Sequence, residues 1–143
     1  MFKHENSFSV KGNIQKIYDF SEKYFLKKGY SVESSHKPNR LALKKKGSRW
    51  ANDIRKNPHD LYVTFIDGDN ISVVMTYIFH AFGFYTPNTK KKLNSDISTF
   101  KEKIQNSPAL FTFKCPYCNR ENPKDANYCN NCGKQLDKTR AYI

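Results

Sequence analysis

All four cysteines of this 143-residue chain lie between positions 115 and 132, in two CxxC pairs. The spacing Cys115-x2-Cys118-x10-Cys129-x2-Cys132 places two thiolates on each of two tight turns. Such turns close around one tetrahedral zinc ion and leave no position for an activated water. The spacing therefore predicts one structural Zn²⁺. Two disulfides or a redox CxxC are the alternatives, and a reducing compartment disfavours the disulfides.

Each CxxC turn is expected to continue into a residue with a left-handed backbone, so that amide groups point at the sulfurs. Gly133 follows the second pair and adopts that conformation without steric cost. Asn119 follows the first pair and is the next best residue for it. Residues 122–125, Asn-Pro-Lys-Asp, have turn composition and are expected to join two short arms.

Residues 115–136 resemble the small zinc-ribbon family, whose members read roughly CPxCGxxxPxDAxFCxxCGxxL. The matching positions are Cys115, Pro116, Cys118, Pro123, Asp125, Ala126, Tyr128, Cys129, Cys132, Gly133 and Leu136, with Tyr128 in place of the usual phenylalanine. Asn119 stands where the family has its first glycine. The resemblance implies a zinc-bound appendage that binds proteins or nucleic acid, or that stabilises its neighbour.

The ribbon segment also carries a candidate basic and aromatic face for nucleic acid. Its members are Tyr117, Arg120, Lys124, Lys134 and Lys138. The alternative is an ordinary solvated surface, with Tyr128 in a small core.

The preceding residues show period-two and helical patterns in a readable order. Strands are expected near 7–11, 30–32, 41–43, 61–66 and 71–79, with helices over 14–28 and along a stripe from Leu93 to Ile104. Asn13 is the expected cap of the first helix, and Gly29 its expected end. Residues 47–60 form a polar loop that contains Trp50 and room for a helical turn.

This order, β-α-β-β-β-β-α, predicts an α+β class with an antiparallel sheet and a helix against one face. It resembles the TATA-binding-protein-like or helix-grip topology by element order alone. That resemblance implies either nucleic-acid binding on the exposed sheet or a small ligand between sheet and helix. We expect a basic α+β domain over 1–107, a short apolar and ordered link over 108–114, the ribbon over 115–137 and a tail over 138–143.

Net charge points to an anionic partner. The chain has 25 Lys and Arg against 13 Asp and Glu, a formal charge of +12. Such a field attracts nucleic acid, an acidic protein or a membrane surface. Two lysine triplets are the candidate contacts, Lys44, Lys45 and Lys46 and then Lys90, Lys91 and Lys92. The second triplet opposes a helix dipole, so either that helix begins at Ser95 or the lysines face an anion; a solvated face is the alternative for both.

Aromatic residues cluster after the last expected strand, at Phe82, Phe84 and Tyr85, and Trp50 lies in the other long loop. They are candidates to line the mouth of a cavity or to stack on single-stranded bases. The alternative is a plug over one end of the core.

No catalytic pattern is found: the four histidines are scattered, and the carboxylates form no metal or acid–base motif. The apolar run from Ile71 to Tyr85 is too short to span a membrane, and the N-terminus lacks the order of a signal peptide. We therefore expect a non-catalytic cytoplasmic protein that binds nucleic acid or an acidic protein. The alternative is a carrier of a small apolar molecule or lipid, with the ribbon as a docking module.

Overall fold

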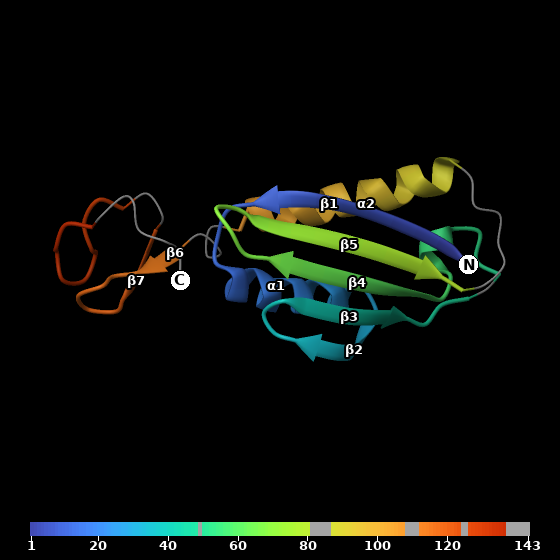
Figure 1. Ribbon diagram of the computed structural model, residues 1–143, viewed down its shortest axis with the longest axis horizontal. Helices are drawn as coiled ribbons and strands as arrows, with labels where there is room; N and C mark the ends of the chain where they lie inside the picture. The colour runs from blue at the N-terminus through green and yellow to red at the C-terminus, as the bar shows by residue number, and fades with distance from the viewer. Residues whose placement is uncertain (49, 81–86, 108–111, 124–125, 137–143) are drawn as a thin grey trace.

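Two helices cover one face of a five-stranded antiparallel sheet, and a small two-stranded unit follows (Figure 1). The computed structural model describes residues 1–48, 50–80, 87–107, 112–123 and 126–136. The elements in chain order are β1 Phe2–Val10, α1 Ile14–Lys27, β2 Tyr30–His36, β3 Arg40–Lys45, a 3-10 turn η1 Ile54–Lys56, β4 His59–Ile66, β5 Ile71–Phe79, α2 Pro87–Gln105, β6 Thr112–Lys114 and β7 Glu121–Pro123. The predicted class and element order are confirmed.

The strands lie in the order β1-β5-β4-β3-β2, so the first strand pairs with the last one of the domain. Side chains alternate along β4 and β5 between buried and half-exposed positions, as expected for a sheet covered on one face. The buried positions join both helices in a single core. Its largest fully buried members are Tyr18, Phe65, Phe79, Phe100, Ile17, Leu41, Leu43, Leu61, Met75, Leu93 and Ile104.

The ends of α1 follow the local chemistry of the chain. The Asn13 side chain accepts a hydrogen bond from the backbone N–H of Lys16 at 3.0 Å, which caps the first turn. Gly29 has φ +94° directly after the helix, a conformation that favours glycine. Both predicted helix signals are confirmed.

The last helix begins earlier than Ser95, the start that one of the two alternatives predicted. It starts at Pro87, so the expectation of a start at Ser95 is wrong, and the lysines 90–92 lie within its first turns. Thr89 and Leu93 are buried there, and tertiary packing of this kind outweighs an unfavourable charge near a helix N-terminus. Proline is also well suited to a first helical position.

The loop between β3 and β4 is held tightly at one glycine. A Cβ atom on Gly47 would lie 2.0 Å from the carbonyl oxygen of Lys56, so no larger residue fits without movement. The neighbouring backbone N–H of Ser48 donates to that same oxygen at 3.0 Å. This contact fixes η1, and with it the side chains of Asp53 and Arg55.

Among the described residues, no helix is long and apolar enough to cross a membrane. Most of the predicted apolar link, residues 108–111, lies outside the described residues, as does the tail over 138–143. The prediction that the link is ordered is therefore not tested.

Candidate functional site

The four predicted zinc ligands converge. Their Sγ atoms all lie within 4.8 Å of one another. Cys115 and Cys132 have their Sγ atoms 3.7 Å apart, and Cys118 and Cys129 have theirs 3.4 Å apart. A tetrahedral ion with Zn–S bonds of about 2.3 Å requires sulfurs about 3.8 Å apart. A disulfide requires about 2.05 Å, so the geometry fits one zinc ion and not bridged sulfurs.

The two CxxC turns repeat the same backbone bonds. Asn119 N–H donates to the Cys115 carbonyl at 2.9 Å, and Gly133 N–H donates to the Cys129 carbonyl at 3.0 Å. Asn119 has φ +66° and Gly133 has φ +74°, so both predicted left-handed positions are confirmed. The backbone N–H groups of Tyr117 and Asn131 each lie 3.4 Å from a ligand sulfur, as amides that support thiolate do.

Cys129 receives the most of this support. Its Sγ accepts from the backbone N–H groups of Cys132 and Asn131 and from the side chain of Asn122. These bonds, the one from Cys132 first, hold the pKa of the Cys129 thiol down at about 5. The thiolate is the form that binds a metal.

Two expectations for the ribbon differ from the structure, and Lys124 and Asp125 of the predicted turn lie outside the described residues. Asn122 is not in a turn but in β7, where its buried side chain also accepts from the backbone N–H of Asn130 at 2.8 Å. Tyr128 is 61% exposed and does not form the small core. That core consists of Cys115, Cys129 and Leu136, with Cys118 and Ala126 against it. Two of the metal ligands are therefore themselves members of the ribbon core.

The ribbon face predicted for nucleic acid is partly assembled. The ammonium group of Lys134 lies 4.5 Å from the centre of the Tyr117 ring, and Tyr117 is 61% exposed. Arg120 is also exposed. Lys124 and Lys138 lie outside the described residues. On the side nearest the domain, Glu121 forms an ion pair of 2.6 Å with Lys16 of α1.

Each lysine triplet has two exposed members and one half-buried member. Lys44, Lys46, Lys90 and Lys91 are exposed. Figure 1 shows the end of β3 and the start of α2 at the same end of the domain. Asp53 of the intervening loop feels the charges of both Lys45 and Lys92, which are half-buried. We define the basic end as the exposed lysines 44, 46, 56, 90 and 91.

Of the predicted stacking residues, Trp50 is 91% exposed. It lies in the loop that leads to η1, and its ring is not part of the core cluster. Phe82, Phe84 and Tyr85 lie outside the described residues.

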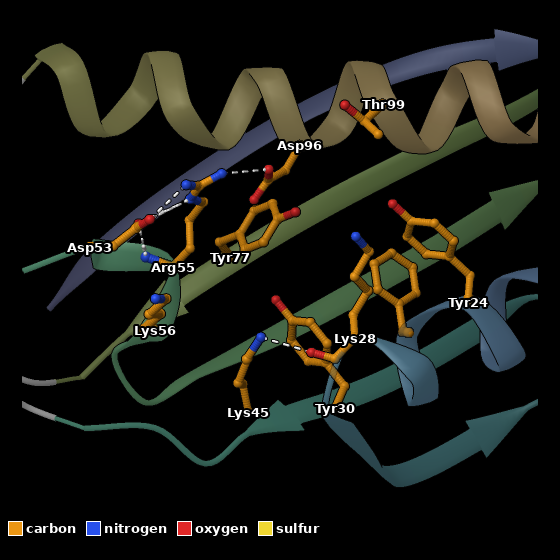
Figure 2. Close-up of a pocket in the computed structure, with 11 residues that line it drawn as sticks. Tyr24, Lys28, Tyr30, Lys45, Asp53, Arg55, Lys56, Tyr77, Asp96 and Thr99 are labelled. Atoms are coloured by element: carbon orange, nitrogen blue, oxygen red, sulfur yellow. Dashed lines mark hydrogen bonds and ion pairs between the residues drawn. The ribbon is translucent and has the colours of Figure 1, made fainter. Parts of the chain in front are cut away.

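A cavity of about 230 Å³ opens between α1, α2 and the sheet (Figure 2). It is lined by Tyr24, Phe25, Lys28, Tyr30, Lys45, Asp53, Arg55, Lys56, Tyr77, Asp96 and Thr99. Its lining contains four cations and two carboxylates together with aromatic rings. A purely apolar ligand is therefore less well matched to it than a polar or charged one.

Arg55 binds both carboxylates of the cavity. Its guanidinium donates to Asp53 at 2.6 Å and to Asp96 of α2 at 3.1 Å. The bond from Arg55 lowers the pKa of the Asp53 carboxyl well below its usual range. The three side chains join η1 to α2 and form one wall of the cavity.

Two of the three lysines that line the cavity, Lys28 and Lys45, lie beside the aromatic rings of Tyr24 and Tyr30. Lys45 donates from Nζ to the backbone carbonyl of Lys28 at 2.8 Å and lies 5.0 Å from the centre of the Tyr30 ring. Burial lowers the pKa of Lys45 and so do the charges of Lys28 and Arg55, whereas the charge of Asp96 raises it. Within the described part of the chain, neither Lys28 nor Lys45 forms an ion pair.

His59, which contacts Tyr30 of the cavity lining, is 2% exposed, and its two ring nitrogens are both bonded. Nδ1 lies 2.7 Å from the carbonyl oxygen of Asn57, so it carries the proton, and Nε2 accepts from the Tyr30 hydroxyl at 2.6 Å. Burial lowers the pKa of His59, which keeps it neutral. Burial likewise raises the pKa of Tyr30.

Most cavity residues belong to no sequence motif, because they come from five separate segments of the chain. Asp53 and Asp96 were single carboxylates without a motif, and Tyr24, Tyr30 and Tyr77 matched ordinary core positions. The one local sign of the cavity in the sequence was Lys45, a charged residue at a position of β3 that faces the helices.

Comparison with known proteins supports the two parts separately. Residues 114–136 match the family model of a zinc-ribbon domain, which confirms the resemblance. No curated protein matches the chain significantly. The solution structure of the Aha1 dimer from Colwellia psychrerythraea is similar with a TM-score of 0.53 and 13% identity, over 77% of this chain and 96% of that one. This likeness agrees with the predicted helix-grip order and concerns the fold alone.

A second solved structure, the crystal structure of TTHA0849 from Thermus thermophilus, has a TM-score of 0.31 and 11% identity, over 71% of this chain and 88% of that one.

Proposed function

We propose that this is a non-catalytic binding protein that contacts a single strand of nucleic acid at the basic end, with the ribbon as a structural zinc unit. The observation that carries the proposal is the gathering of lysines without an ion pair among the described residues, at the end of β3, in η1 and at the start of α2, with the exposed Trp50 in the loop between Lys46 and Lys56. Four sulfurs occupy every position of a tetrahedral zinc ion, so the proposal includes no reaction at the metal.

The absence of carboxylate partners supports an anionic ligand at the basic end. Arg55 is held by Asp53 and Asp96, whereas the five lysines of the basic end form no ion pair with any described residue. Unpaired lysines keep their full charge for phosphates and release counterions when a strand binds. Affinity should therefore fall as salt concentration rises.

Trp50 is the observation that favours nucleic acid over an acidic protein. Its ring is 91% exposed, and an exposed indole next to a basic surface is a platform for base stacking. Acidic protein segments offer charge but no planar base for this ring. The ribbon pair Tyr117 and Lys134 is a smaller surface of the same chemistry.

Fluorescence anisotropy with a labelled oligonucleotide of about 20 bases tests the proposal. We expect affinity to fall steeply between about 50 and about 200 mM salt. The double variant Lys46→Glu, Lys91→Glu should bind at least about tenfold more weakly, and Trp50→Ala should weaken binding of single strands.

The matched control is Lys11→Glu, Lys103→Glu, which makes the same change in net charge with exposed lysines outside the basic end. If the control pair weakens binding as much as the test pair, or if salt has no effect, the basic end is not the contact. Equal binding of polyglutamate would favour an acidic protein partner instead.

A further inference from the structure

We propose that the cavity between α1, α2 and the sheet is a separate binding site for a small aromatic carboxylate, with Tyr77, Lys28 and Lys45 as the groups that hold the anion. Lys56 of the basic end also lines the cavity, but the three groups that hold the anion are not members of that end, so this inference does not depend on the proposed contact with nucleic acid.

Tyr77 is the first reason. The residue is 3% exposed, yet its hydroxyl forms no hydrogen bond to any other described residue. Figure 2 shows this hydroxyl directed into the cavity from β5, towards the side on which α2 lies. Buried polar groups are almost always satisfied, because an unmade hydrogen bond is costly. A water molecule or a ligand atom in the cavity would complete the hydrogen bonding of Tyr77.

The charges around the cavity favour an anion as the ligand. The lining carries four cations against two carboxylates, a formal excess of +2, and neither Lys28 nor Lys45 forms an ion pair with any described residue. An anion in the cavity offsets this excess of positive charge. In Figure 2 the ammonium group of Lys28 and the hydroxyls of Tyr24 and Tyr77 face the same open space.

The same surroundings favour a singly charged carboxylate. The carboxyl group of Asp96 also lines the cavity, and a doubly charged phosphate would face more repulsion from it than a carboxylate would. A carboxylate also accepts from an ammonium group and from the Tyr77 hydroxyl at once.

The aromatic walls and the volume of the cavity indicate the size and shape of the rest of the ligand. The rings of Tyr24, Phe25, Tyr30 and Tyr77 all line the cavity, and aromatic walls favour a planar ring by stacking or edge contacts. The volume of about 230 Å³ lies below the usual range for drug-sized ligands, so the ligand is one ring with a short side chain. Phenylacetate has this chemistry.

A titration of the zinc-loaded chain with phenylacetate, followed by two-dimensional amide NMR, tests the site. We expect saturable shifts at cavity residues with a Kd of about 1 to 10 mM, the range for a ligand of this size. The neutral isostere phenylacetamide should bind at least about tenfold more weakly, because it lacks the charge-assisted bonds.

Two variants and their controls separate the site from nonspecific binding. Tyr77→Phe should weaken phenylacetate binding but leave the melting temperature of the free protein unchanged or higher, because it removes an unsatisfied hydroxyl. Lys28→Gln should weaken binding about tenfold. Lys23→Gln on the same helix and Tyr117→Phe in the ribbon lie outside the cavity and should change nothing.

Three results would overturn the inference. The first is no saturable shift at about 20 mM phenylacetate, well above the expected Kd. The second is equal binding of phenylacetamide, which would show that the cavity does not select an anion. The third is a clear loss of melting temperature in Tyr77→Phe, which would show that the hydroxyl has a structural partner.

Discussion

The rings of Phe25 on α1 and Phe100 on α2 lie with their centroids 4.9 Å apart. Two helices that are far apart in the sequence therefore meet over the same face of the sheet. Phe100 also contacts Tyr24 at 5.0 Å and Phe8 of β1 at 5.9 Å, so one side chain joins both helices to an edge strand. The position of the helices, and with it the cavity between them, depends on this contact.

Phe100→Ala should therefore cost about 3–5 kcal/mol of unfolding free energy, the usual loss for a fully buried phenylalanine. Urea unfolding at constant m-value measures it. Leu26→Ala is the control, because Leu26 is 48% exposed and should cost less than about 1 kcal/mol. Equal losses in the two variants would mean that the contact between the helices is not a main source of stability.

Gly47→Ala should destabilise the loop that carries Asp53 and Arg55. The new methyl group would lie 2.0 Å from the Lys56 carbonyl oxygen, and this neighbour is backbone that cannot rotate away. We expect a loss of about 1–3 kcal/mol and altered amide NMR signals over residues 47–57. Gly68→Ala is the control, since its Cβ would lie 3.4 Å from the nearest atom and has no such clash. A tolerated Gly47→Ala would show that the loop can shift.

Stability should fall as the solution becomes acidic, because of His59. Burial lowers the pKa of His59 below its ordinary 6.5, so near that pH the unfolded chain binds a proton more readily than the folded one. Above pH 6.5, His59 should add no pH dependence to the free energy of unfolding. Below pH 6.5, it should make the free energy of unfolding decrease by up to about 1.4 kcal/mol per pH unit. Urea midpoints measured between about pH 5 and pH 8 test this window.

His59→Gln supplies the comparison for this slope, because an amide does not titrate. The variant loses ring packing as well, so the change with pH is compared and not the absolute stability. If the slope below pH 6.5 is the same in both proteins, His59 is not its cause.

Local backbone chemistry was predictable from the sequence. Asn13, Gly29, Asn119 and Gly133 each occupy the position that their residue type predicts, because capping and left-handed conformations depend on only a few neighbouring residues. The cysteine spacing was equally informative, since four ligands on two turns leave one compact solution.

The first strand shows where such patterns are incomplete. It begins at Phe2, whereas the expected strand began at residue 7. The earlier part gave no strand signal, because His4 and Asn6 occupy helix-facing positions where apolar residues were expected. Both side chains bond to the Asn94 side chain of α2, at 2.7 and 3.1 Å. A polar cluster between a strand and a distant helix leaves no period-two hydrophobic signal.

The cavity was not predictable for a related reason. Lys45, Arg55, Tyr77 and Asp96 lie on four different elements, and only the folded sheet and helices bring them together. The sequence indicated a space between sheet and helix through element order, but its charge follows from which side chains turn inward. Lys45 is an example, because its neighbours Lys44 and Lys46 are exposed.

Removal of zinc should unfold the ribbon and leave the α+β domain folded. The ribbon core contains three buried residues, two of them metal ligands, and is too small to fold without the ion. The core of the domain shares no residue with it. The ion pair between Lys16 and Glu121 joins the two units, and a partly exposed pair contributes about 1 kcal/mol or less.

A chelator titration followed by amide NMR measures both units at once. Signals of residues 114–136 should collapse towards those of unfolded chain, while signals of the five-stranded sheet remain and its urea midpoint shifts little. Cys129→Ser should give the same result without chelator, which controls for effects of the chelator on the domain. Simultaneous loss of both sets of signals would contradict the prediction, because it would mean that the ribbon contributes far more to the stability of the domain than one surface ion pair can.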